Sequence, residues 1–566
     1  MPQDAFTLRR NVRELEKLLV GGKINKVVQP TKDEVLLYIY TGKSLLKLII
    51  CTNASFCRIC LTEEEKDAPS VAPNFCMLLR KHLLGAQITA VAQTGFERIV
   101  AITLHCVSDF TQTDRVLYAE IMGKYSNIVL TEQGVILGAL KTASLETNAV
   151  RVLFPGARYA LPAPQDKADP TDRAALTAAV AAVLSSADPA AALADRVAGI
   201  AYPTAAQIVA DYPLNTGMPF SDFVYDYLFA GDDAPCVLCR DGVPVEFGAK
   251  MLAGATPVTS LQEAQETVYG YKSNKKAFEE KKRRLSAAAA GLKKKQEKKL
   301  AQILEKLQEC EDAEACRLKG ELITANIYRL ERGMSACKLE NYYEEGAPLL
   351  TIALDKTLSP AQNAQKYYKR YAKLKRTVEA LTPRLKAERA ELDYTESVLS
   401  SVAQAEEMQD LAEIEEELIA LHLLRAPQGQ SGKRRKPAET PFRVFEKEGF
   451  VIRAGRNNVQ NDRLVRASAP DDIWLHTQKY HSAHVVIAAE GRKVPETVLE
   501  FAARICAYYS DGRGGGKLPV DYCQRKFVKK PSGGKAGFVH YTDYKTVLVE
   551  PFAAPPPAAP AAGPRE

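Results

Sequence analysis

Three of the chain's seven histidines lie close to its single tryptophan. His476, His481 and His484 fall in the segment DDIWLHTQKYHSAHVVI (471–487), which also contains Trp474. Imidazoles can ligate metals, act as general bases or contact nucleic acid. Trp474 and His476 are two residues apart and therefore share one side of an extended segment. No acid or cysteine follows at ligand spacing, so we predict a polar, aromatic-lined surface for RNA, with Trp474, His476 and His484 in contact, rather than a metal site.

Two Cys-X-X-Cys pairs imitate half-sites for zinc: Cys57 with Cys60, and Cys236 with Cys239. The segment SFCRICLT around the first pair is predicted to be a strand, in which residues three apart point to opposite faces. The second pair is far away along the chain. We therefore interpret these cysteines as small buried hydrophobic residues and predict neither a metal nor another cofactor.

Two further motifs suggest catalysis but lack necessary partners. GRGGGK (512–517) resembles a phosphate-binding loop, yet Asp511 replaces its first glycine and Leu518 replaces the magnesium-binding Ser or Thr. Pro2 could supply an amine nucleophile, as in certain DNA glycosylases, but no partner acid follows. We predict no catalytic residue, with a DNA-glycosylase-like enzyme as an alternative.

The net charge of +7 is unevenly distributed, with basic residues concentrated in 271–320, 361–376 and 512–545. Such clustering is typical of proteins that bind a polyanion. Solvated helix faces explain much of 271–320, but 361–376 interleaves cations with three tyrosines, which suits both phosphate contact and base stacking. The basic residues expected to bind RNA are Lys366, Lys369, Arg370, Lys373, Arg525, Lys526, Lys529 and Lys530.

No apolar run is long enough to span a membrane, and the start MPQDAFTLRRNVREL is predicted to be a charged helix rather than a signal peptide. We therefore expect a cytoplasmic protein with reduced cysteines.

The element pattern predicts an α+β multidomain protein. In residues 1–165, a helix that ends at Gly21-Gly22 is followed by short strands rich in Val, Ile, Leu and Tyr, which favours an antiparallel sheet with few helices. In 166–270, an Ala-rich helical stretch leads to two short helices joined through Gly199-Ile200. That pattern is typical of a helix-hairpin-helix, whose turn offers backbone amides to phosphate.

Heptad-like spacing of apolar residues over 271–425 predicts an antiparallel coiled coil with a small globular tip at about 320–360. A polar linker then leads to a second α+β domain and a tail that is too poor in apolar residues to fold. The predicted boundaries are 426–441 for the linker, 442–551 for the domain and 552–566 for the tail.

Several stretches of the chain resemble the NFACT family, also called the fibronectin-binding-protein-A-like family. They are INKVVQP, GELITANIYRLERGM with NYY, LSPAQNAQKYYKRYAKLK, and IRAGRNNVQNDRLV with DIWLHTQKYHSAHVVI and VDYCQRKFVKKPSGGKAGFVHY. The resemblance spans nearly the whole chain. It implies an NFACT N-terminal domain, a helix-hairpin-helix, a coiled-coil middle and an RNA-binding C-terminal domain.

The family resemblance also implies a function, ribosome-associated quality control. Such a factor binds the large ribosomal subunit carrying peptidyl-tRNA, recruits charged tRNA and supports untemplated tailing of the stalled chain, with alanine from tRNA-Ala in bacterial members. The ribosome makes the peptide bonds, so the factor is not an enzyme. The resemblance allows a small RNA-binding partner protein and implies neither membrane nor DNA. A fibronectin-binding surface adhesin is an alternative that the missing export signal disfavours.

Two family motifs implied to contact tRNA map to the N-terminal domain. The family's Asp-Arg pair falls on Glu97 and Arg98, where glutamate adds one methylene. The EIMGKYSN motif is intact and begins with Glu120, Ile121 and Met122. The competing interpretation of Glu97 and Arg98 is a surface ion pair between strands, which would contribute little.

Overall fold

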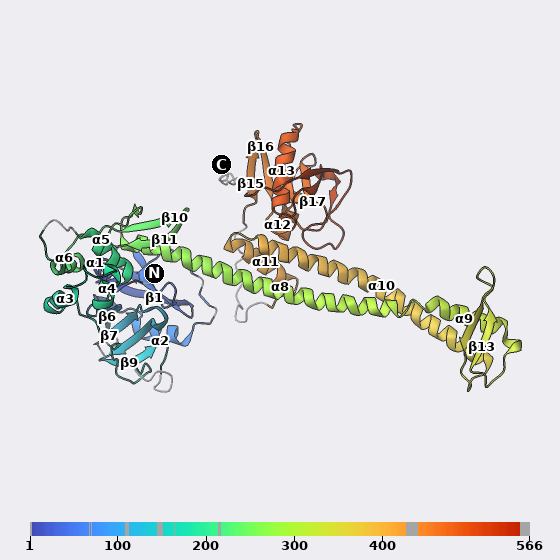
Figure 1. The fold of residues 1–566 in the computed structure, drawn as a ribbon, viewed down its shortest axis with the longest axis horizontal. Coiled ribbons are helices and arrows are strands. Elements are labelled where there is room, and N and C mark those ends of the chain that lie inside the picture. The colour runs from blue at the N-terminus through green and yellow to red at the C-terminus, as the bar shows by residue number, and fades with distance from the viewer. Residues whose placement is uncertain are drawn as a thin grey trace. The chain divides into compact units, whose positions relative to one another are not determined.

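A computed structural model describes residues 3–66, 68–69, 71–107, 112–143, 151–163, 165–212, 217–425 and 440–554 (Figure 1). It confirms the predicted α+β multidomain class. Pro2, the linker up to residue 439 and the tail from residue 555 lie outside the described residues. The chain divides into two compact units, Met1–Ala277 (unit 1) and the part that begins at Phe278 (unit 2).

Unit 1 is built around a nine-stranded antiparallel sheet, in the strand order β4-β3-β2-β1-β5-β6-β7-β8-β9. Apolar residues of alternating strand positions pack beneath helices α1 and α2 and form the main core. The sequence predicted these strands and their antiparallel pairing. The elements are α1 (Ala5–Leu19), β1 (Lys23–Thr31), β2 (Glu34–Tyr40), β3 (Leu45–Cys51), β4 (Arg58–Leu61), α2 (Asn74–Leu83), β5 (Gln87–Gln93), β6 (Ile99–Val107), β7 (Gln112–Glu120), the 3-10 helix η1 (Gly123–Tyr125), β8 (Asn127–Glu132) and β9 (Val135–Ala139).

A second core in unit 1 joins four short helices to the start of α1 and to Phe96. Helices α4 and α5 correspond to the predicted hairpin around Gly199. A three-stranded sheet, in the order β11-β10-β12, was not predicted. These elements are α3 (Arg173–Val180), α4 (Pro189–Arg196), α5 (Tyr202–Asp211), α6 (Phe220–Phe229), β10 (Cys236–Arg240), β11 (Val243–Gly248), β12 (Thr256–Pro257), α7 (Leu261–Gln265) and the π-helical turn η2 (Glu266–Gly270).

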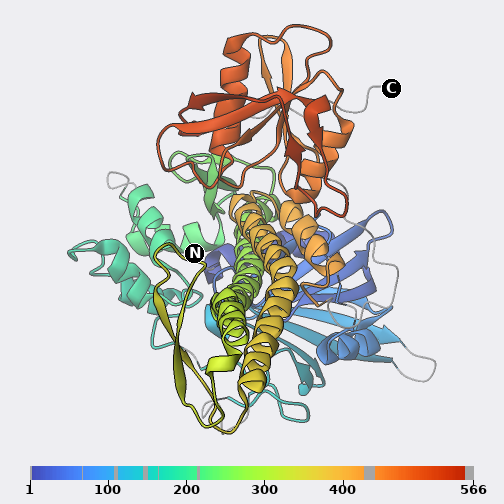
Figure 2. The same ribbon diagram turned by 90° about the vertical axis from the view of Figure 1, so that its right-hand side faces the viewer.

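Two long helices run side by side as an antiparallel pair, α8 (Tyr271–Gln308) and α10 (Pro360–Gln404) (Figure 2). Their direction follows from two ion pairs, Lys293 with Glu396 at 2.8 Å and Lys299 with Glu388 at 3.3 Å. Apolar side chains of both helices share a core with α11 (Met408–Ala420). A capping box formed by Ser359 and Gln362 starts α10.

The far end of the helix pair carries a small tip module (Figure 1). A two-stranded antiparallel sheet packs with the start of α10 and with α9 around an apolar core. The elements are α9 (Ala313–Ala325), the 3-10 helix η3 (Ile327–Arg329), β13 (Ala336–Glu340) and β14 (Leu349–Ala353).

The C-terminal domain is a six-stranded antiparallel sheet in the order β15-β16-β18-β17-β19-β22. Helix α13 packs on one face, and α12 contributes to the apolar cluster on the other. The elements are β15 (Arg443–Lys447), β16 (Phe450–Ala454), α12 (Asn458–Ala467), β17 (Ile473–Thr477), β18 (Val485–Ile487), α13 (Glu496–Tyr508), β19 (Leu518–Gln524), the 3-10 helix η4 (Arg525–Phe527), β20 (Val528–Lys529), β21 (His540–Tyr541) and β22 (Lys545–Val549). Among the described residues, no helix has the length and apolarity needed to cross a membrane.

Candidate nucleic-acid interface

Glu97 and Arg98 lie in the turn between β5 and β6, just before the strand in which the sequence placed them. Backbone bonds fix this turn, since Thr94 N donates to Ile99 O and Ile121 N donates to Arg98 O at 2.8 Å. Neither the Glu97 nor the Arg98 side chain makes an ion pair or hydrogen bond with a described residue. The surface ion-pair interpretation thus finds no partner within the described part of the chain, and Arg98 is a partly exposed residue on a fixed backbone.

The side chain of Phe96 anchors this turn in the second core of unit 1. Its ring is buried against Phe229, with ring centroids 5.4 Å apart. Gly199, in the hairpin turn between α4 and α5, lies directly above it, and a Cβ at Gly199 would come within 2.7 Å of the Phe96 carbonyl oxygen. The hairpin thus holds the Arg98 turn in place. This close packing explains why a residue without a side chain stands at position 199.

Glu120 and Ile121 are buried rather than exposed to a ligand. Glu120 accepts a bidentate pair of hydrogen bonds from Arg151, at 2.6 and 3.0 Å, and a third from the Tyr159 hydroxyl at 2.8 Å. Burial, and next the Glu120 carboxylate, raise the pKa of Tyr159, so its hydroxyl stays protonated as a donor. Direct tRNA contact by Glu120 or Ile121 is thus contradicted by their burial.

The exposed part of this motif lies a few residues further on. Met122 is partly exposed, and its backbone N–H donates to Ser126 Oγ at 2.9 Å, which closes the turn at Gly123. Tyr125 is 69% exposed, and the Lys124 ammonium lies 4.9 Å from its ring centroid. A cation beside an exposed aromatic face suits contact with an RNA base. Lys124 and Tyr125 were absent from the residues predicted to bind tRNA, although the intact motif contains both.

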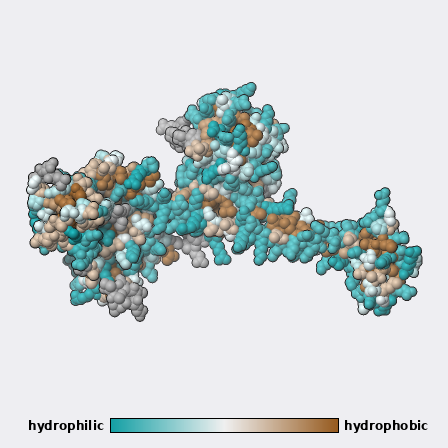
Figure 3. All heavy atoms as spheres, viewed as in Figure 1, coloured by the Kyte–Doolittle hydropathy of each residue, from teal (hydrophilic) through white to brown (hydrophobic). Residues whose placement is uncertain are grey.

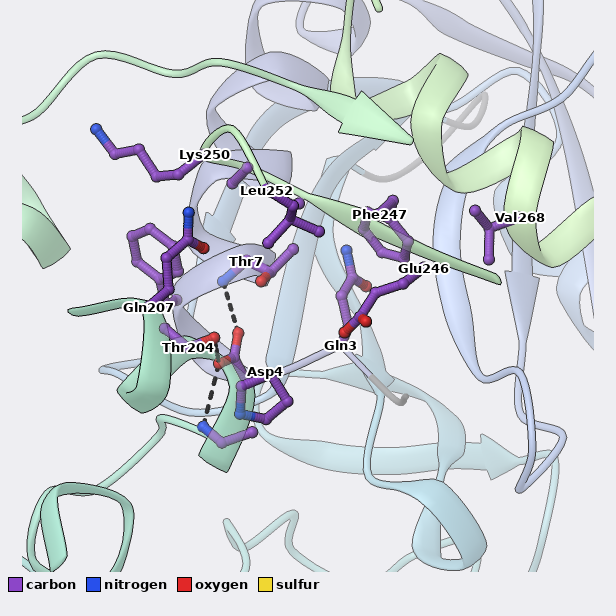
Figure 4. Close-up of a pocket in the computed structure, with 15 residues that line it drawn as sticks. Gln3, Asp4, Thr7, Thr204, Gln207, Glu246, Phe247, Lys250, Leu252 and Val268 are labelled. Atoms are coloured by element: carbon purple, nitrogen blue, oxygen red, sulfur yellow. Dashed lines mark hydrogen bonds between the residues drawn. The ribbon is translucent and has the colours of Figure 1, made fainter. Parts of the chain in front are cut away.

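The helix-hairpin-helix has fewer free backbone amides for binding a phosphate than its sequence suggested. Asp4 Oδ2 accepts from Ala201 N at 3.1 Å and from Thr204 Oγ1 at 2.5 Å, while Asp4 Oδ1 accepts from Thr7 N at 2.9 Å. Figure 4 shows Asp4 beside Thr7 and Thr204 on the wall of a cavity of about 60 Å³. A carboxylate of the protein itself thus caps the start of both α1 and α5, where a phosphate would otherwise bind.

Four basic side chains follow one another along α10 next to the tip. Lys366, Lys369, Arg370 and Lys373 are all exposed, and Lys366 Nζ lies 2.9 Å from Asp355 Oδ2. The tyrosines between them do not serve as predicted: Tyr367 and Tyr368 pack into the tip core, and the Tyr367 hydroxyl donates to Ala353 O at 2.7 Å. The segment therefore offers charge for phosphates without these two rings for stacking.

Exposed aromatic side chains gather elsewhere on the tip. Tyr328, Tyr342 and Tyr343 are each more than half exposed, and the Arg329 guanidinium lies 5.3 Å from the Tyr328 ring centroid. Hydrophobic residues on the tip surface are visible in Figure 3. The sequence signal for this surface was the doublet Tyr342-Tyr343 in a turn.

The four basic residues predicted in the C-terminal domain lie in η4, in β20 and just after it, but their partners differ. Arg525 is held by the protein, since its Nε donates to Val465 O at 2.7 Å. Lys526 and Lys530 are exposed and have acidic neighbours, Asp471 and Asp462 respectively. Lys529 is exposed and makes no ion pair with a described residue. Lys526, Lys529 and Lys530 remain candidates for RNA contact.

Trp474 is not the surface residue that the sequence suggested. Its side chain is fully buried, His484 is nearly so, and His476 is partly exposed. The predicted juxtaposition of Trp474 and His476 is confirmed, because their rings are parallel to within 1° with centroids 5.8 Å apart. A base cannot stack on Trp474 from open solvent, and these rings instead line a cavity.

Two groups of residues could be considered as metal ligands, the cysteines near β4 and an acidic cluster beside His481. Cys57 and Cys60 belong to separate cores on opposite faces of β4, as strand alternation predicted. Among the described residues, the one cluster with ligand-like spacing is Asp393, Glu396 and His481. The two acids come from α10, far from the histidines in sequence. Such exposed clusters are common without a metal, so this one assigns no site.

Acidification should destabilise the C-terminal domain through His476 and His484. Burial lowers the pKa of His476 to about 4 and that of His484 well below its usual range. Because the unfolded pKa is about 6.5, the stability that the neutral imidazole contributes is present above pH 6.5 and is lost as the pH falls towards 4. For one histidine the loss is at most about 1.4 kcal/mol per pH unit.

Urea unfolding followed by Trp474 fluorescence, at several pH values, tests this prediction. Wild type should lose stability relative to His476→Gln below pH 6.5. The opposite trend expected from Glu417, whose pKa burial raises to about 7, is common to both proteins and cancels in the difference. Parallel pH profiles for the two proteins would contradict the lowered pKa of His476.

The arrangement, with basic surfaces and a separate C-terminal domain, is typical of one class of protein, multidomain proteins that bind nucleic acid. Two family models divide the chain accordingly. NFACT N-terminal and middle domains match residues 4–437, and the NFACT protein RNA binding domain matches 441–536. The chain therefore belongs to the NFACT family, which confirms the resemblance in its sequence.

Full-length relatives support the same assignment. The Rqc2 homolog RqcH of Bacillus subtilis is 32% identical over 556 residues, covering 95% of this chain and 96% of the relative. RqcH of Streptococcus pneumoniae (serotype 2) is 32% identical over 561 residues, covering 97% and 98%. Among solved structures, the C-terminal part of the fibronectin/fibrinogen-binding protein from Streptococcus suis is 30% identical, with 49% of this chain and 96% of that chain covered and a TM-score of 0.39.

Proposed function

We propose that this protein is a ribosome-associated quality control factor. It binds the large ribosomal subunit carrying peptidyl-tRNA, recruits charged tRNA-Ala and supports untemplated C-terminal tailing of the stalled chain. The observation that carries the proposal is the near full-length similarity to RqcH proteins, which includes the RNA-binding domain.

The geometry suits a factor that positions RNA. Arg98 and the exposed Lys124 and Tyr125 offer polar and aromatic contacts to tRNA in unit 1, while the basic tip segment and the C-terminal lysines suit ribosomal RNA. Holding charged tRNA beside the peptidyl-tRNA raises its effective concentration, so the peptide bond can form at the ribosome's own centre. No side chain of this protein is required to act as acid, base or nucleophile.

Removing the four cations next to the tip should weaken binding to the large subunit. The variant Lys366→Ala, Lys369→Ala, Arg370→Ala, Lys373→Ala removes exposed charges that would displace counterions from RNA. For each RNA phosphate that the variant no longer neutralises, the slope of log affinity against log salt should fall by about 0.7–0.9. Co-sedimentation with purified large subunits across a salt series measures both the affinity and the slope.

A matched control removes four exposed cations of α8 that make no ion pair with a described residue: Arg283, Lys294, Lys295 and Lys298. These residues lie in the segment 271–320, whose basic side chains we interpret largely as solvated helix faces. The control should therefore change the salt slope less than the tip variant does. Equal co-sedimentation of the tip variant and wild type at every salt concentration would contradict the role given to this segment.

A further inference from the structure

A cavity of about 420 Å³ lies within unit 2, between α10 and the face of the C-terminal sheet that carries Trp474. Its walls come from four places: α10 with its serines, the asparagine-rich segment 455–461, β17 with the segment that follows it, and the segment 537–541. This volume is in the range of about 300–1,000 Å³ that is typical of small-molecule sites. The basic surfaces described above do not use it.

One wall of the cavity is built from aromatic rings at fixed angles. The parallel Trp474 and His476 rings are both perpendicular to His484, at 88°, with centroids 5.3 and 5.4 Å from it. The ring centroid of Tyr541 lies 4.9 Å from that of Trp474. Flat faces and ring edges arranged in this way favour a planar π system as the occupant.

Two buried polar atoms in this wall have no hydrogen-bond partner among the described residues: Trp474 Nε1 and His484 Nδ1. Their side chains are 0% and 2% exposed. Buried donors and acceptors of this kind are normally paired with protein, water or ligand, and leaving one unpaired is unfavourable. A ligand with polar ring atoms would supply such partners after a small movement of the rings.

The charges around the cavity favour a hydrogen-bond donor over a phosphate. Arg456 is already engaged by Glu407 at 3.3 Å and Asp410 at 3.4 Å. Lys479 is exposed at the mouth, but Asp393, whose side chain is 52% exposed, lines the same cavity. Glu396 also lines it and is held by Lys293 at 2.8 Å. Carboxylates repel a phosphate and accept hydrogen bonds from amino groups.

We propose that this cavity binds one unpaired nucleobase that carries an exocyclic amino group. The base would lie against the partly exposed His476 and Tyr541 rings, with its amino edge towards the Asp393 carboxylate of α10. Such splayed-out bases are how proteins commonly read single-stranded RNA. The source of the base, an unpaired nucleotide of bound RNA rather than a free nucleoside, rests on the function proposed above; the cavity chemistry does not.

The single tryptophan makes the test direct, because Trp474 fluorescence reports from the cavity wall alone. Adenosine, cytidine, guanosine and uridine are titrated into the full chain. The three amino-bearing nucleosides should give saturable changes, with at least about tenfold tighter binding than uridine, which lacks the amino group. No saturable change, or equal affinity for all four, would overturn the proposal.

Variants separate binding in the cavity from binding elsewhere. Ser401→Phe extends a ring from α10 into the cavity and should abolish the fluorescence change, whereas Ser401→Ala leaves the cavity open and should preserve it. Asp393→Ala removes a half-exposed carboxylate without changing the core. It should lower the affinity for amino-bearing nucleosides and leave the affinity for uridine unchanged. Circular dichroism and melting temperature check folding. If a folded Ser401→Phe protein binds like wild type, the cavity is not the site.

A single-stranded oligoadenylate and the same strand in a duplex distinguish the two sources of the base. If only the single strand matches or exceeds the affinity of free adenosine, the occupant is a base of RNA. If free adenosine alone binds, the cavity is a nucleoside site. If the wild-type protein binds large subunits but binds neither nucleosides nor the oligoadenylate, only the cavity proposal is contradicted. If the wild-type protein does not bind large subunits, the proposed function is contradicted.

Discussion

Replacing Arg98 by alanine should weaken tRNA binding about tenfold to hundredfold. A charge-assisted hydrogen bond contributes about 1.5–3 kcal/mol, and 1.4 kcal/mol corresponds to a factor of ten in affinity. The loss should approach the upper part of this range because the turn is held by Phe96, Gly199 and the bond from Ile121 N. The guanidinium is thus already positioned and makes no ion pair with a described residue that must first be broken.

Three measurements give this prediction its controls. Arg98→Lys should restore only part of the affinity, because an ammonium keeps the charge but lacks the planar fork of donors. Large-subunit co-sedimentation should be unchanged, since the contacts that we propose with the subunit lie on the tip and the C-terminal domain. The melting temperature should also stay the same. An equal loss of tRNA and subunit binding would indicate misfolding, and no loss of either would remove Arg98 from the interface.

Replacing Glu120 by alanine should lower the free energy of unfolding of unit 1 by about 3–5 kcal/mol, the usual cost of breaking a buried ion pair by removing one partner. The Glu120 side chain is 1% exposed and that of Arg151 11% exposed, so the guanidinium would stay largely buried without its acid. The Tyr159 hydroxyl would lose its acceptor as well. Urea unfolding followed by circular dichroism measures the change.

Glu97→Ala is the matched control, since it removes a carboxylate that makes no hydrogen bond or ion pair with a described residue in the same part of unit 1. Its unfolding free energy should stay within about 0.5 kcal/mol of wild type. Below its melting transition, Glu120→Ala should bind tRNA with an affinity close to that of wild type. A stable Glu120→Ala protein that fails to bind tRNA would instead make Glu120 a direct contact.

The strands of the N-terminal sheet could be predicted because each is a short run of β-branched and apolar residues bounded by turn signals. The sheet's antiparallel pairing follows from connections too short for crossovers. The coiled coil was equally readable from its apolar spacing. In contrast, β10, β11 and β12 are only five, six and two residues long. The alternation of Val243, Val245 and Phe247 in β11 was a strand signal that was missed.

Burial of polar and aromatic residues could not be predicted in the same way. Glu120 was assigned to the tRNA surface because its burial depends on Arg151, a residue thirty-one positions away with no local signature. Tyr367 and Tyr368 were read as stacking residues because their core partners on α9 and β14 are brought to them by the fold. Trp474 was predicted to lie on the surface for a related reason. Helix α10, which is distant in sequence, covers one side of the cavity that Trp474 lines.

Affinity purification of the protein from stalled-translation extracts, with sequencing of the bound RNA, tests the central claim most directly. The account predicts large-subunit ribosomal RNA together with a tRNA population dominated by tRNA-Ala, and selective loss of that tRNA in Arg98→Ala. Recovery of bulk tRNA in its cellular proportions, or of no ribosomal RNA, would contradict it.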